Sequence, residues 1–404
     1  MTALGTAWSA VGGDAALLPR VSTVVREGAL DARLPVRELA RACVGACALA
    51  AAESCEAGLS QASRVLPLVT LAHGPSASNN HYWPEVYTNL ALVDGSGKRA
   101  YAFDMEGAVR FGNAPTFDPA LFATAREYVE DLLAGRTCHR YTPLDVADWL
   151  EEMAIGCETA LTKARGAADF GRAEVQRILL DVQILGCIAR YFAERFRAAC
   201  WAELFVASNV NALLEPALDH ARRAVLAWEG AAAVSRDLYP DDITYGPQSW
   251  LRGSWHSRLP EMQAELLDLE AVRNLGGTES VKADAATAAA VEALRARRPT
   301  VAGGPIAEAA ASFAAGKPFP VRLRAVADLD PVLHYRHINQ AERWRSTAMR
   351  KNGDGFTAEI PADYTESEFH LQFFISLNRQ GQAVLVPGLQ DNLANEPYVT
   401  VLQE

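Results

Sequence analysis

The sequence predicts a multidomain α+β chain, in which a short α/β part precedes a large α-helical bundle and a β-sandwich follows it. The chain has 404 residues, too many for one core, because hydrophobic cores stop growing at about 250–300 residues. Apolar residues recur with the helical period between 118 and 272. Beyond 323 they alternate with polar residues, and the turn signals between short runs are typical of a sandwich.

The first 117 residues are predicted to form the α/β segment. Alanine-rich sequence with a helical pattern fills 1–60. The branched apolar run at 64–72 predicts a fully buried strand, although Pro67 disfavours one. A helix followed by a buried strand is the repeating unit of α/β architecture, so this part resembles the end of a parallel sheet.

The helical bundle is predicted at 118–272 from helix-start and helix-stop signals. A capping residue followed by proline marks a first turn, and glycine commonly ends a helix. Helix starts are predicted at 118–119, at 142–143, near Arg172 and near Leu213, with a helix end at Gly135.

A partly helical linker is predicted at 273–322, where Gly and Pro pairs flank an alanine-rich stretch. The sandwich predicted at 323–404 is of immunoglobulin or fibronectin type, and we expect residues from about 325 onward to fold alone. The sequence Asn-Gly-Asp-Gly at 352–355 is its strongest hairpin signal. Strands are predicted at 332–337, 344–349, 356–360, 371–377, 383–386 and 398–402.

Composition and charge exclude several classes of function. The formal net charge is −11 and the pI is about 5.3, so neither nucleic acid nor an anionic membrane surface is an expected partner. The sequence contains no GxGxxG, GxxxxGK[ST], HExxH or GxSxG motif. We therefore expect no cofactor and no metal. The first ten residues lack a basic region and an apolar core, which predicts a cytoplasmic location, unless a longer parent chain carries an export signal.

The seven cysteines are predicted to be free and mostly buried thiols. Their number is odd, no CxxC pair occurs, and most lie in helix-like sequence. Cys43 and Cys47 are four residues apart, but no second pair follows at the spacing of a zinc finger.

The densest cluster of chemistry-bearing residues occupies 75–89, directly after the predicted strand. Ligands bind at the carboxyl ends of strands in α/β sheets and barrels. Aromatic rings stack on sugar faces, and amide and imidazole groups satisfy hydroxyls, so this composition suits a sugar site. The alternative is a structural loop whose aromatic side chains pack on the bundle. The candidate substrate-binding residues are His73, Asn79, Asn80, Tyr82, Trp83 and Tyr87.

Glu85 is the one carboxylate of this cluster and the candidate catalytic residue. Glycoside hydrolysis normally needs a second carboxyl group about 5–9.5 Å away. Its nearest neighbours in sequence are Asp94, Asp104 and Glu106, and none of them stands in a recognisable motif.

Two other aromatic-rich regions allow a binding or a structural interpretation. The segment 239–260 combines Trp, His, Arg and Asp residues, and the structural interpretation is an interhelix loop tied by Arg–Asp pairs. Tyr335, His337 and Trp344 on the sandwich could form a sugar platform, although core or interdomain packing is favoured.

The order of these parts resembles the C-terminal half of large bacterial glycoside-hydrolase-like proteins with a (β/α)8 barrel. The resemblance lies in segments 75–89, 239–260 and 332–398, of which the last looks like an accessory sandwich. It implies an oligosaccharide or polysaccharide substrate and a fragment of a TIM barrel at the N-terminal end. The chain departs from that pattern because a barrel takes about 250 residues, far more than precede the aromatic cluster.

Three functions remain open from the sequence. The first is a glycoside-hydrolase-type enzyme or a C-terminal fragment of one. The second is a non-catalytic carbohydrate-binding or scaffold protein. The third is an interaction protein without a small ligand. Two carboxylates that converge beside Trp83 would favour the first.

Overall fold

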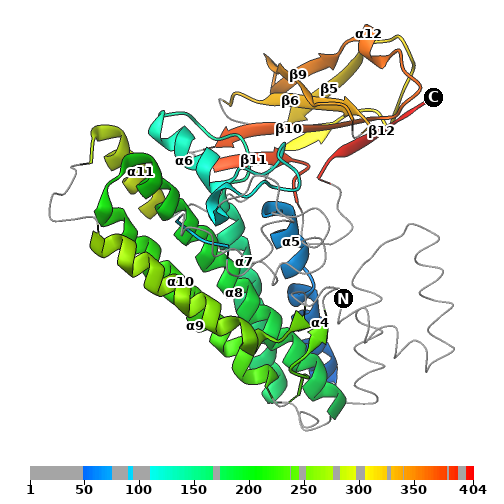
Figure 1. Ribbon diagram of the computed structural model, residues 1–404. Helices are drawn as coiled ribbons and strands as arrows, with labels where there is room; N and C mark the ends of the chain where they lie inside the picture. The colour runs from blue at the N-terminus through cyan, green and yellow to red at the C-terminus, as the bar shows by residue number, and fades with distance from the viewer. Residues whose placement is uncertain are drawn as a thin grey trace. The chain divides into compact units, whose positions relative to one another are not determined.

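The computed structural model describes two compact units. The helical unit comprises 1–133 and 143–294, and the sandwich unit comprises 134–142 and 295–404 (Figure 1). The structure describes residues 49–74, 90–93, 110–166, 173–236, 238–244, 252–275, 283–296, 305–324, 329–339, 341–379, 382–389 and 397–404.

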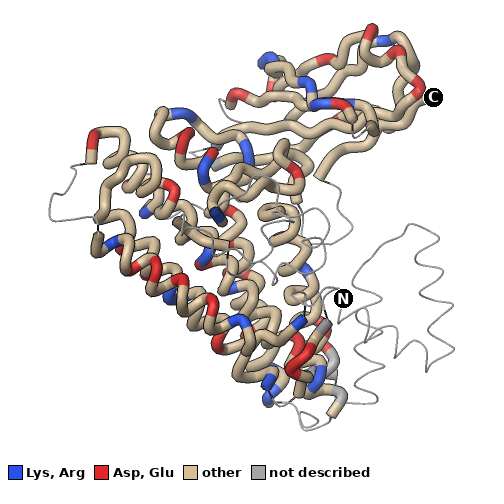
Figure 2. The backbone as a smooth tube through the Cα atoms, viewed as in Figure 1, with Lys and Arg blue, Asp and Glu red and all other residues tan. Residues whose placement is uncertain are grey.

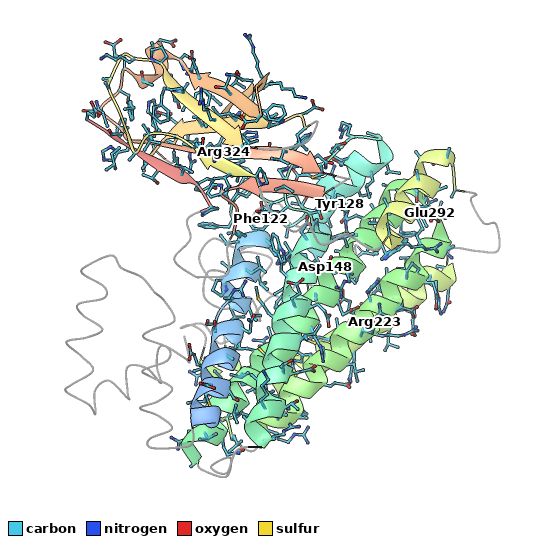
Figure 3. All side chains as sticks on the ribbon, turned by 180° about the vertical axis from the view of Figure 1, so that it is seen from behind. Phe122, Tyr128, Asp148, Arg223, Glu292 and Arg324 are labelled. Carbon is cyan, nitrogen blue, oxygen red and sulfur yellow. The ribbon has the colours of Figure 1, made fainter. Side chains whose placement is uncertain are left out.

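The helical unit is built around one long helix, α8, which packs against α4, α6, α7 and α9. Figure 3 shows the side chains of this bundle, with Asp148 labelled on α7 and Arg223 on α9. Its described helices are α4 (Leu49–Ala62), α5 (Val65–Ala72), η3 (Phe111–Asn113), α6 (Ala125–Leu133), α7 (Pro143–Arg165), α8 (Ala173–Ser208), η4 (Asn211–Leu213), α9 (Leu214–Ser235), α10 (Trp255–Leu275) and α11 (Ala285–Arg295). A short hairpin of β1 (Ile243–Thr244) and β2 (Arg252–Gly253) precedes α10.

The predicted starts of α7, α8 and α9 are confirmed to within a few residues, because their apolar faces form the core of the unit. The start of α6 differs from the prediction. Thr124 caps it by a reciprocal pair of hydrogen bonds with Glu127, at 3.1 Å and 2.9 Å. Asp118 instead accepts a bond from the Ala120 N–H in the preceding turn. Gly135 follows α6 with φ of +63°, the conformation of a helix end.

The predicted strand at 64–72 is wrong, because residues Val65–Ala72 form helix α5. The buried residues of this run are Val65, Leu68, Val69 and Ala72, which follow the helical spacing i, i+3, i+4 and i+7. Pro67 lies in the first turn, where a missing N–H breaks no helical hydrogen bond. The described residues before 75 are therefore helical, and the α/β pairing expected there is absent from them.

One end of the helical unit closes around two tryptophans. Trp228 of α9 is fully buried and donates a hydrogen bond from Nε1 to the Trp255 carbonyl at 2.7 Å. Arg252 pairs with Asp242 across the β1–β2 hairpin, as the structural interpretation of 239–260 predicted. That segment is not a loop throughout, since α10 begins at Trp255 and continues through Pro260.

The sandwich unit consists of two sheets that share one hydrophobic core. One sheet has the order β4-β12-β10-β6-β7, with β11 also on β10, and the other has the order β3-β5-β9-β8. The elements are β3 (Ile306–Glu308), β4 (Ser312–Phe313), β5 (Phe319–Arg324), β6 (Val332–His337), β7 (Arg345–Ala348), β8 (Arg350–Asn352), β9 (Gly355–Ile360), α12 (Ala362–Thr365), β10 (Leu371–Arg379), β11 (Gln382–Val386) and β12 (Val399–Gln403).

The strands predicted beyond 330 are confirmed, and so is the hairpin turn. Asn352 pairs with Gly355 across a two-residue turn, in which Gly353 has φ of +62°. The chain passes from one sheet to the other at Met349, between β7 and β8. Leu333, Phe373 and Ile375 are completely buried between the sheets.

The sandwich unit begins earlier in the sequence than the predicted start at 323. Strand β5 pairs with β9 over its full length and buries Phe319, Val321 and Leu323 while its other residues face outward. The prolines around it had indicated a linker. Pro320 is tolerated because β3 pairs only with the far end of β5, so the strand is an edge at that position.

The short segment 134–142 also belongs to the sandwich unit, although α6 and α7 of the helical unit flank it. The Tyr141 hydroxyl accepts a hydrogen bond from the Leu389 N–H at 3.4 Å, after β11. Gly388 has φ of +76°, and a Cβ there would lie 3.1 Å from that hydroxyl. The sandwich unit is therefore assembled from two separate stretches of the chain.

The described cysteines are all free thiols, namely Cys55, Cys138, Cys157, Cys187 and Cys200, while Cys43 and Cys47 lie outside the described residues. Within the described ranges, no helix combines the length and apolar character that a membrane crossing needs. Acidic and basic residues are interspersed along the helices of the helical unit (Figure 2).

Candidate functional site

The candidate site of the sequence analysis lies mostly outside the described residues. Segment 75–89, which contains Asn79, Asn80, Tyr82, Trp83, Glu85 and Tyr87, is not among them. The carboxylates Asp94, Asp104 and Glu106 also lie outside. His73 is described, and so are the residues that directly flank the segment. The placement of the segment's own side chains, including Glu85, stays a prediction.

The two ends of segment 75–89 are anchored on the same part of the helical unit. At the first end, the Gly74 N–H donates to the Pro115 carbonyl at 2.7 Å. At the other end, the Leu90 carbonyl accepts a hydrogen bond of 2.6 Å from Arg195 of α8. The Ala91 carbonyl accepts from the Phe111 N–H at 2.7 Å. Phe111 and Pro115 are only four residues apart, so both ends of the segment are held at one short stretch of the unit.

An aromatic stack supports the first of these ends. The His73 ring lies 3.9 Å from the Phe111 ring, with 19° between their planes, and Phe196 of α8 meets both rings edge-on. His73 is only 2% exposed. Burial, together with the nearby Arg195 guanidinium, lowers the pKa of His73 to about 3 against the opposing influence of the Phe111 backbone. His73 is therefore neutral at physiological pH.

A buried ion pair supports the second end. Arg195 Nη1 lies 2.6 Å from Glu265 Oε2 of α10, and the two side chains are 3% and 11% exposed. Glu265 also accepts a hydrogen bond of 3.0 Å from the Leu92 N–H. The Arg195 guanidinium lies 5.1 Å from the Phe111 ring centre. Arg195 and Glu265 thus hold residues 90–92, and we call His73, Leu90, Phe111, Arg195 and Glu265 the stem of segment 75–89.

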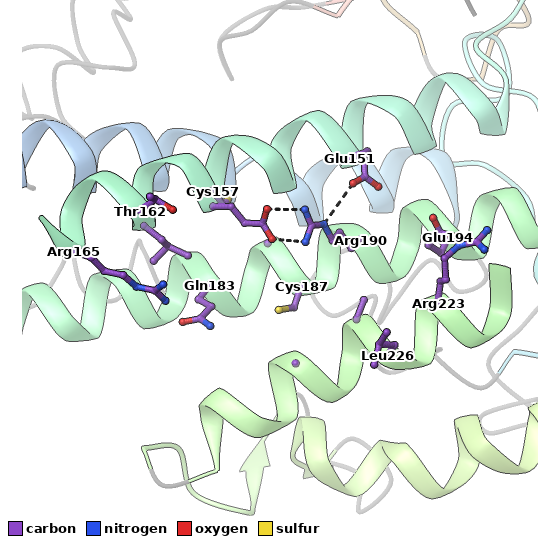
Figure 4. Close-up of a pocket in the computed structure, with 15 residues that line it drawn as sticks. Glu151, Cys157, Thr162, Arg165, Gln183, Cys187, Arg190, Glu194, Arg223 and Leu226 are labelled. Carbon is purple, nitrogen blue, oxygen red and sulfur yellow. Dashed lines mark hydrogen bonds and ion pairs between the residues drawn. The ribbon is translucent and has the colours of Figure 1, made fainter. Parts of the chain in front are cut away.

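A groove of about 640 Å³ lies elsewhere on the helical unit, among helices α7, α8 and α9 (Figure 4). Its floor contains small or apolar residues, including Gly186, Cys187 and Gly230. A Cβ on Gly186 would lie 3.1 Å from Cys157, and one on Gly230 would lie 3.2 Å from the Cys187 sulfur. The glycines therefore let the helices approach closely, and they contribute no side chain of their own to the floor.

The walls of the groove carry ion pairs between helices. Both terminal nitrogens of the Arg190 guanidinium on α8 donate to the Glu158 carboxylate of α7, and Nη2 lies 2.7 Å from Oε2. Arg190 Nε also lies 3.5 Å from Glu151 Oε1 (Figure 4). At the other end, Glu194 accepts bonds from His220 Nδ1 at 2.6 Å and from Arg223 Nε at 2.9 Å. Each carboxylate of the groove is thus already paired with a basic side chain.

The Glu194 carboxylate is held in its ionised form. Burial raises its pKa, but the hydrogen bond and charge of His220, together with Arg223, outweigh burial and lower the pKa to about 2. A general acid in hydrolysis needs a proton to give near neutral pH. Glu194 is therefore unsuited to act as a general acid near neutral pH.

Acid titration offers a test of the Glu194 network. Because its folded pKa of about 2 lies below the ordinary value of 4.5, its contribution to stability is present above pH 4.5 and is lost as the pH falls toward 2. We expect the stability advantage of the wild type over Glu194→Gln in urea unfolding to shrink across that window. The control is Glu152→Gln, an exposed position on α7. An advantage that stays constant down to about pH 2.5 would contradict the assigned ionisation.

Sequence reasoning missed the groove, although helix α8 carries a signal of it. Gln183, Gly186, Cys187, Arg190 and Glu194 follow the spacing i, i+3, i+4, i+7 and i+11, so small and polar residues form one stripe on an otherwise apolar helix. The partners of that stripe on α7 and α9 are distant in sequence and left no local pattern. The described residues contain no group of three or more His, Cys, Asp or Glu side chains placed to bind a metal ion.

The possible sugar platform on the sandwich is largely internal. Tyr335 and His337 are 6% and 7% exposed, and His337 packs on Tyr364 with 4.3 Å between ring centres. Trp344 is half-buried beneath the Arg336 guanidinium, at 4.6 Å. The core-packing interpretation therefore holds for Tyr335 and His337.

No protein-family model matches the chain, and no curated protein matches it significantly. Among solved structures, the chain is similar to a GH138 enzyme targeting pectin rhamnogalacturonan II, with a TM-score of 0.44 and 14% sequence identity. The similarity covers 56% of this chain and 32% of that enzyme, so the chain spans about a third of its length. At this TM-score the similarity carries no argument about what the chain binds.

Proposed function

We propose that the chain is a carbohydrate-active protein that binds an oligosaccharide or polysaccharide through segment 75–89. The observation that supports the proposal is the stem, in which one buried ion pair and one aromatic stack anchor both ends of the segment. Binding loops are commonly surface segments positioned by a rigid scaffold. The residues carried between these anchors include Tyr82, Trp83 and Tyr87, whose rings suit sugar stacking.

The finer proposal is activity of the glycoside-hydrolase type, with Glu85 as the acid, base or nucleophile. The described carboxylates of the stem and its surroundings are unsuited to that role, because Glu265 and Glu203 are engaged with Arg195 and Arg110. A second catalytic carboxylate would therefore come from the chain between 94 and 109. The alternative is a non-catalytic carbohydrate-binding or scaffold protein, which needs only the aromatic and amide residues.

The sandwich takes an accessory role in this proposal, and we assign it to the immunoglobulin or fibronectin type. The proposal does not extend to a barrel fragment. The barrel interpretation depended on a buried strand at 64–72, and that run forms helix α5.

Substitution of Trp83 tests the binding part of the proposal. Stacking on an aromatic face contributes about 1 kcal/mol beyond area burial, and about 1.4 kcal/mol is a factor of ten in affinity. We expect Trp83→Ala to weaken binding by about tenfold in calorimetry against a panel of oligosaccharides. Phe369→Ala is the control, because Phe369 is an aromatic residue that is 44% exposed and belongs to the sandwich unit. Absence of heat with every glycan would favour a structural loop.

The variant Glu85→Gln separates catalysis from binding, because it keeps the shape of the side chain and removes its charge. Acid–base groups contribute about 10²–10⁴-fold to rate. If Glu85 is catalytic, glycan turnover falls by that factor while calorimetric affinity persists. A parallel fall in affinity and turnover would assign Glu85 to hydroxyl binding and remove the hydrolase proposal for this residue.

A further inference from the structure

Among the described residues that line the groove of α7, α8 and α9, one basic side chain takes no part in the ion-pair network. Glu158 is matched by Arg190, Glu194 by Arg223 and His220, and Glu151 by Arg190 and Arg197. Arg165, in the last turn of α7, lines the same groove. Among the described residues none pairs with its guanidinium. Within the part of the chain that the structure describes, the groove therefore has an unmatched positive group at one end.

Two neutral hydrogen-bonding side chains lie at that same end. Figure 4 shows Thr162 and Gln183 near Arg165, while Glu194 and Arg223 lie toward the opposite end. No hydrogen bond joins the Gln183 amide or the Thr162 hydroxyl to another described residue. An amide both donates and accepts, and so does a hydroxyl, so the pair can satisfy ligand hydroxyls in either direction.

The size and floor of the groove limit the ligand further. From Gln183 to Glu194 it follows α8 for about 16 Å, at about 1.5 Å per residue. Its volume of about 640 Å³ is in the range of small-molecule sites. Gly186, Cys187 and Ala227 contribute to a floor that offers apolar contact to the C–H face of a ring. A ligand with hydroxyls along its edges and a C–H face below matches this arrangement.

We propose that the groove binds a sugar acid, a polyhydroxylated ring with one carboxylate, which pairs with Arg165 while its hydroxyls meet Gln183, Thr162 and the Glu158–Arg190 pair. A planar carboxylate matches the guanidinium fork in a two-pronged contact. This site goes beyond the proposed function, since it shares no residue with segment 75–89 or its stem.

The test is calorimetry of the full chain with glucuronate and with glucose, which differ by the carboxylate. We expect glucuronate to bind at least about tenfold more tightly than glucose, the effect of one charge-assisted contact. Arg165→Ala should remove that preference, and Arg165→Lys should restore part of it. Lys163→Ala is the matched control, because Lys163 lies in the same helical turn, is exposed and does not line the groove. It should leave the affinity for glucuronate within about twofold.

A second readout locates the ligand. Cys187 is a half-buried thiol of the groove, so bound glucuronate should slow its modification by a thiol reagent, as measured by peptide mass spectrometry. Equal affinity of the wild type and Arg165→Ala for glucuronate would overturn the inference, and so would unprotected Cys187 at saturating glucuronate. If Trp83→Ala abolishes glucuronate binding and Arg165→Ala does not, the groove proposal fails while the proposed function stands. If Arg165→Ala abolishes glucuronate binding and Trp83→Ala does not, the result supports the groove proposal and does not bear on segment 75–89.

Discussion

A fragment of residues 325–404 is expected to remain unfolded, whereas a fragment of residues 295–404 folds cooperatively. The sequence alone led us to expect the shorter fragment to fold, but it lacks β3, β4 and β5, and β5 is the partner of β9 along its whole length. It also loses Phe319, Val321 and Leu323, which are 3%, 0% and 1% exposed. Burial of each such side chain contributes about 1.5–3 kcal/mol, and their sum is comparable to the total stability of a small domain, about 5–15 kcal/mol.

Far-UV circular dichroism and thermal unfolding of the two fragments provide the measurement. The longer fragment should show β-sheet signal and one cooperative transition, and the shorter one should show neither. Because 134–142 is missing from both, a third sample with that peptide added to the longer fragment checks its contribution. A cooperative transition in the 325–404 fragment would show that the sandwich does not depend on β5.

The second large effect is expected at the stem. Glu265→Gln keeps the shape of the side chain but leaves the Arg195 guanidinium without its counter-charge in the core. Removing one partner of a buried ion pair typically costs about 3–5 kcal/mol. The free energy of unfolding in urea should fall by that amount. Because Arg195 also holds the Leu90 carbonyl, glycan binding through segment 75–89 should weaken in the same variant.

Glu261→Gln is the matched control for this prediction. Glu261 lies one helical turn earlier on α10 and is exposed, so the same chemical change there should alter the free energy of unfolding by less than about 0.5 kcal/mol. Equal stability of the two variants would mean that the Arg195–Glu265 pair does not stabilise the unit. Loss of stability without loss of glycan binding would show that segment 75–89 binds glycan without support from the Arg195–Glu265 pair.

The sequence was most informative where one face of an element is buried and its period is therefore visible. The long run of apolar residues in α8 and the alternation in β6 and β10 are such cases. The run at 64–72 failed because a short, wholly apolar stretch has the composition of a buried strand and of a buried helix alike. Strand β5 was not predicted, because prolines in a sequence usually indicate a linker. Pro320 lies at an edge position, where it removes no hydrogen bond between strands.

The groove and the stem could not be derived from sequence for a different reason. Their pairs join distant positions, such as Glu158 with Arg190 and Arg195 with Glu265, and no local spacing encodes which charged residues meet. A carboxylate that is surrounded by arginine looks the same in sequence as one that faces solvent. His73 was predicted to be a binding residue, and the structure places its ring in a buried stack on Phe111.

The composition of the sandwich unit from 134–142 and 295–404 has a consequence for the order of events on the ribosome. The helical unit is complete in sequence once Leu294 has been synthesised, so it can close its core while the remaining chain is still being made. The segment 134–142 has been synthesised by then, but the rest of the sandwich unit, residues 295–404, has not. It stays tethered between α6 and α7 until Leu389, whose N–H bonds to the Tyr141 hydroxyl, has been synthesised. Any release of the nascent chain before Gln403, where β12 pairs with β4, therefore yields a finished helical unit joined to an unclosed sandwich.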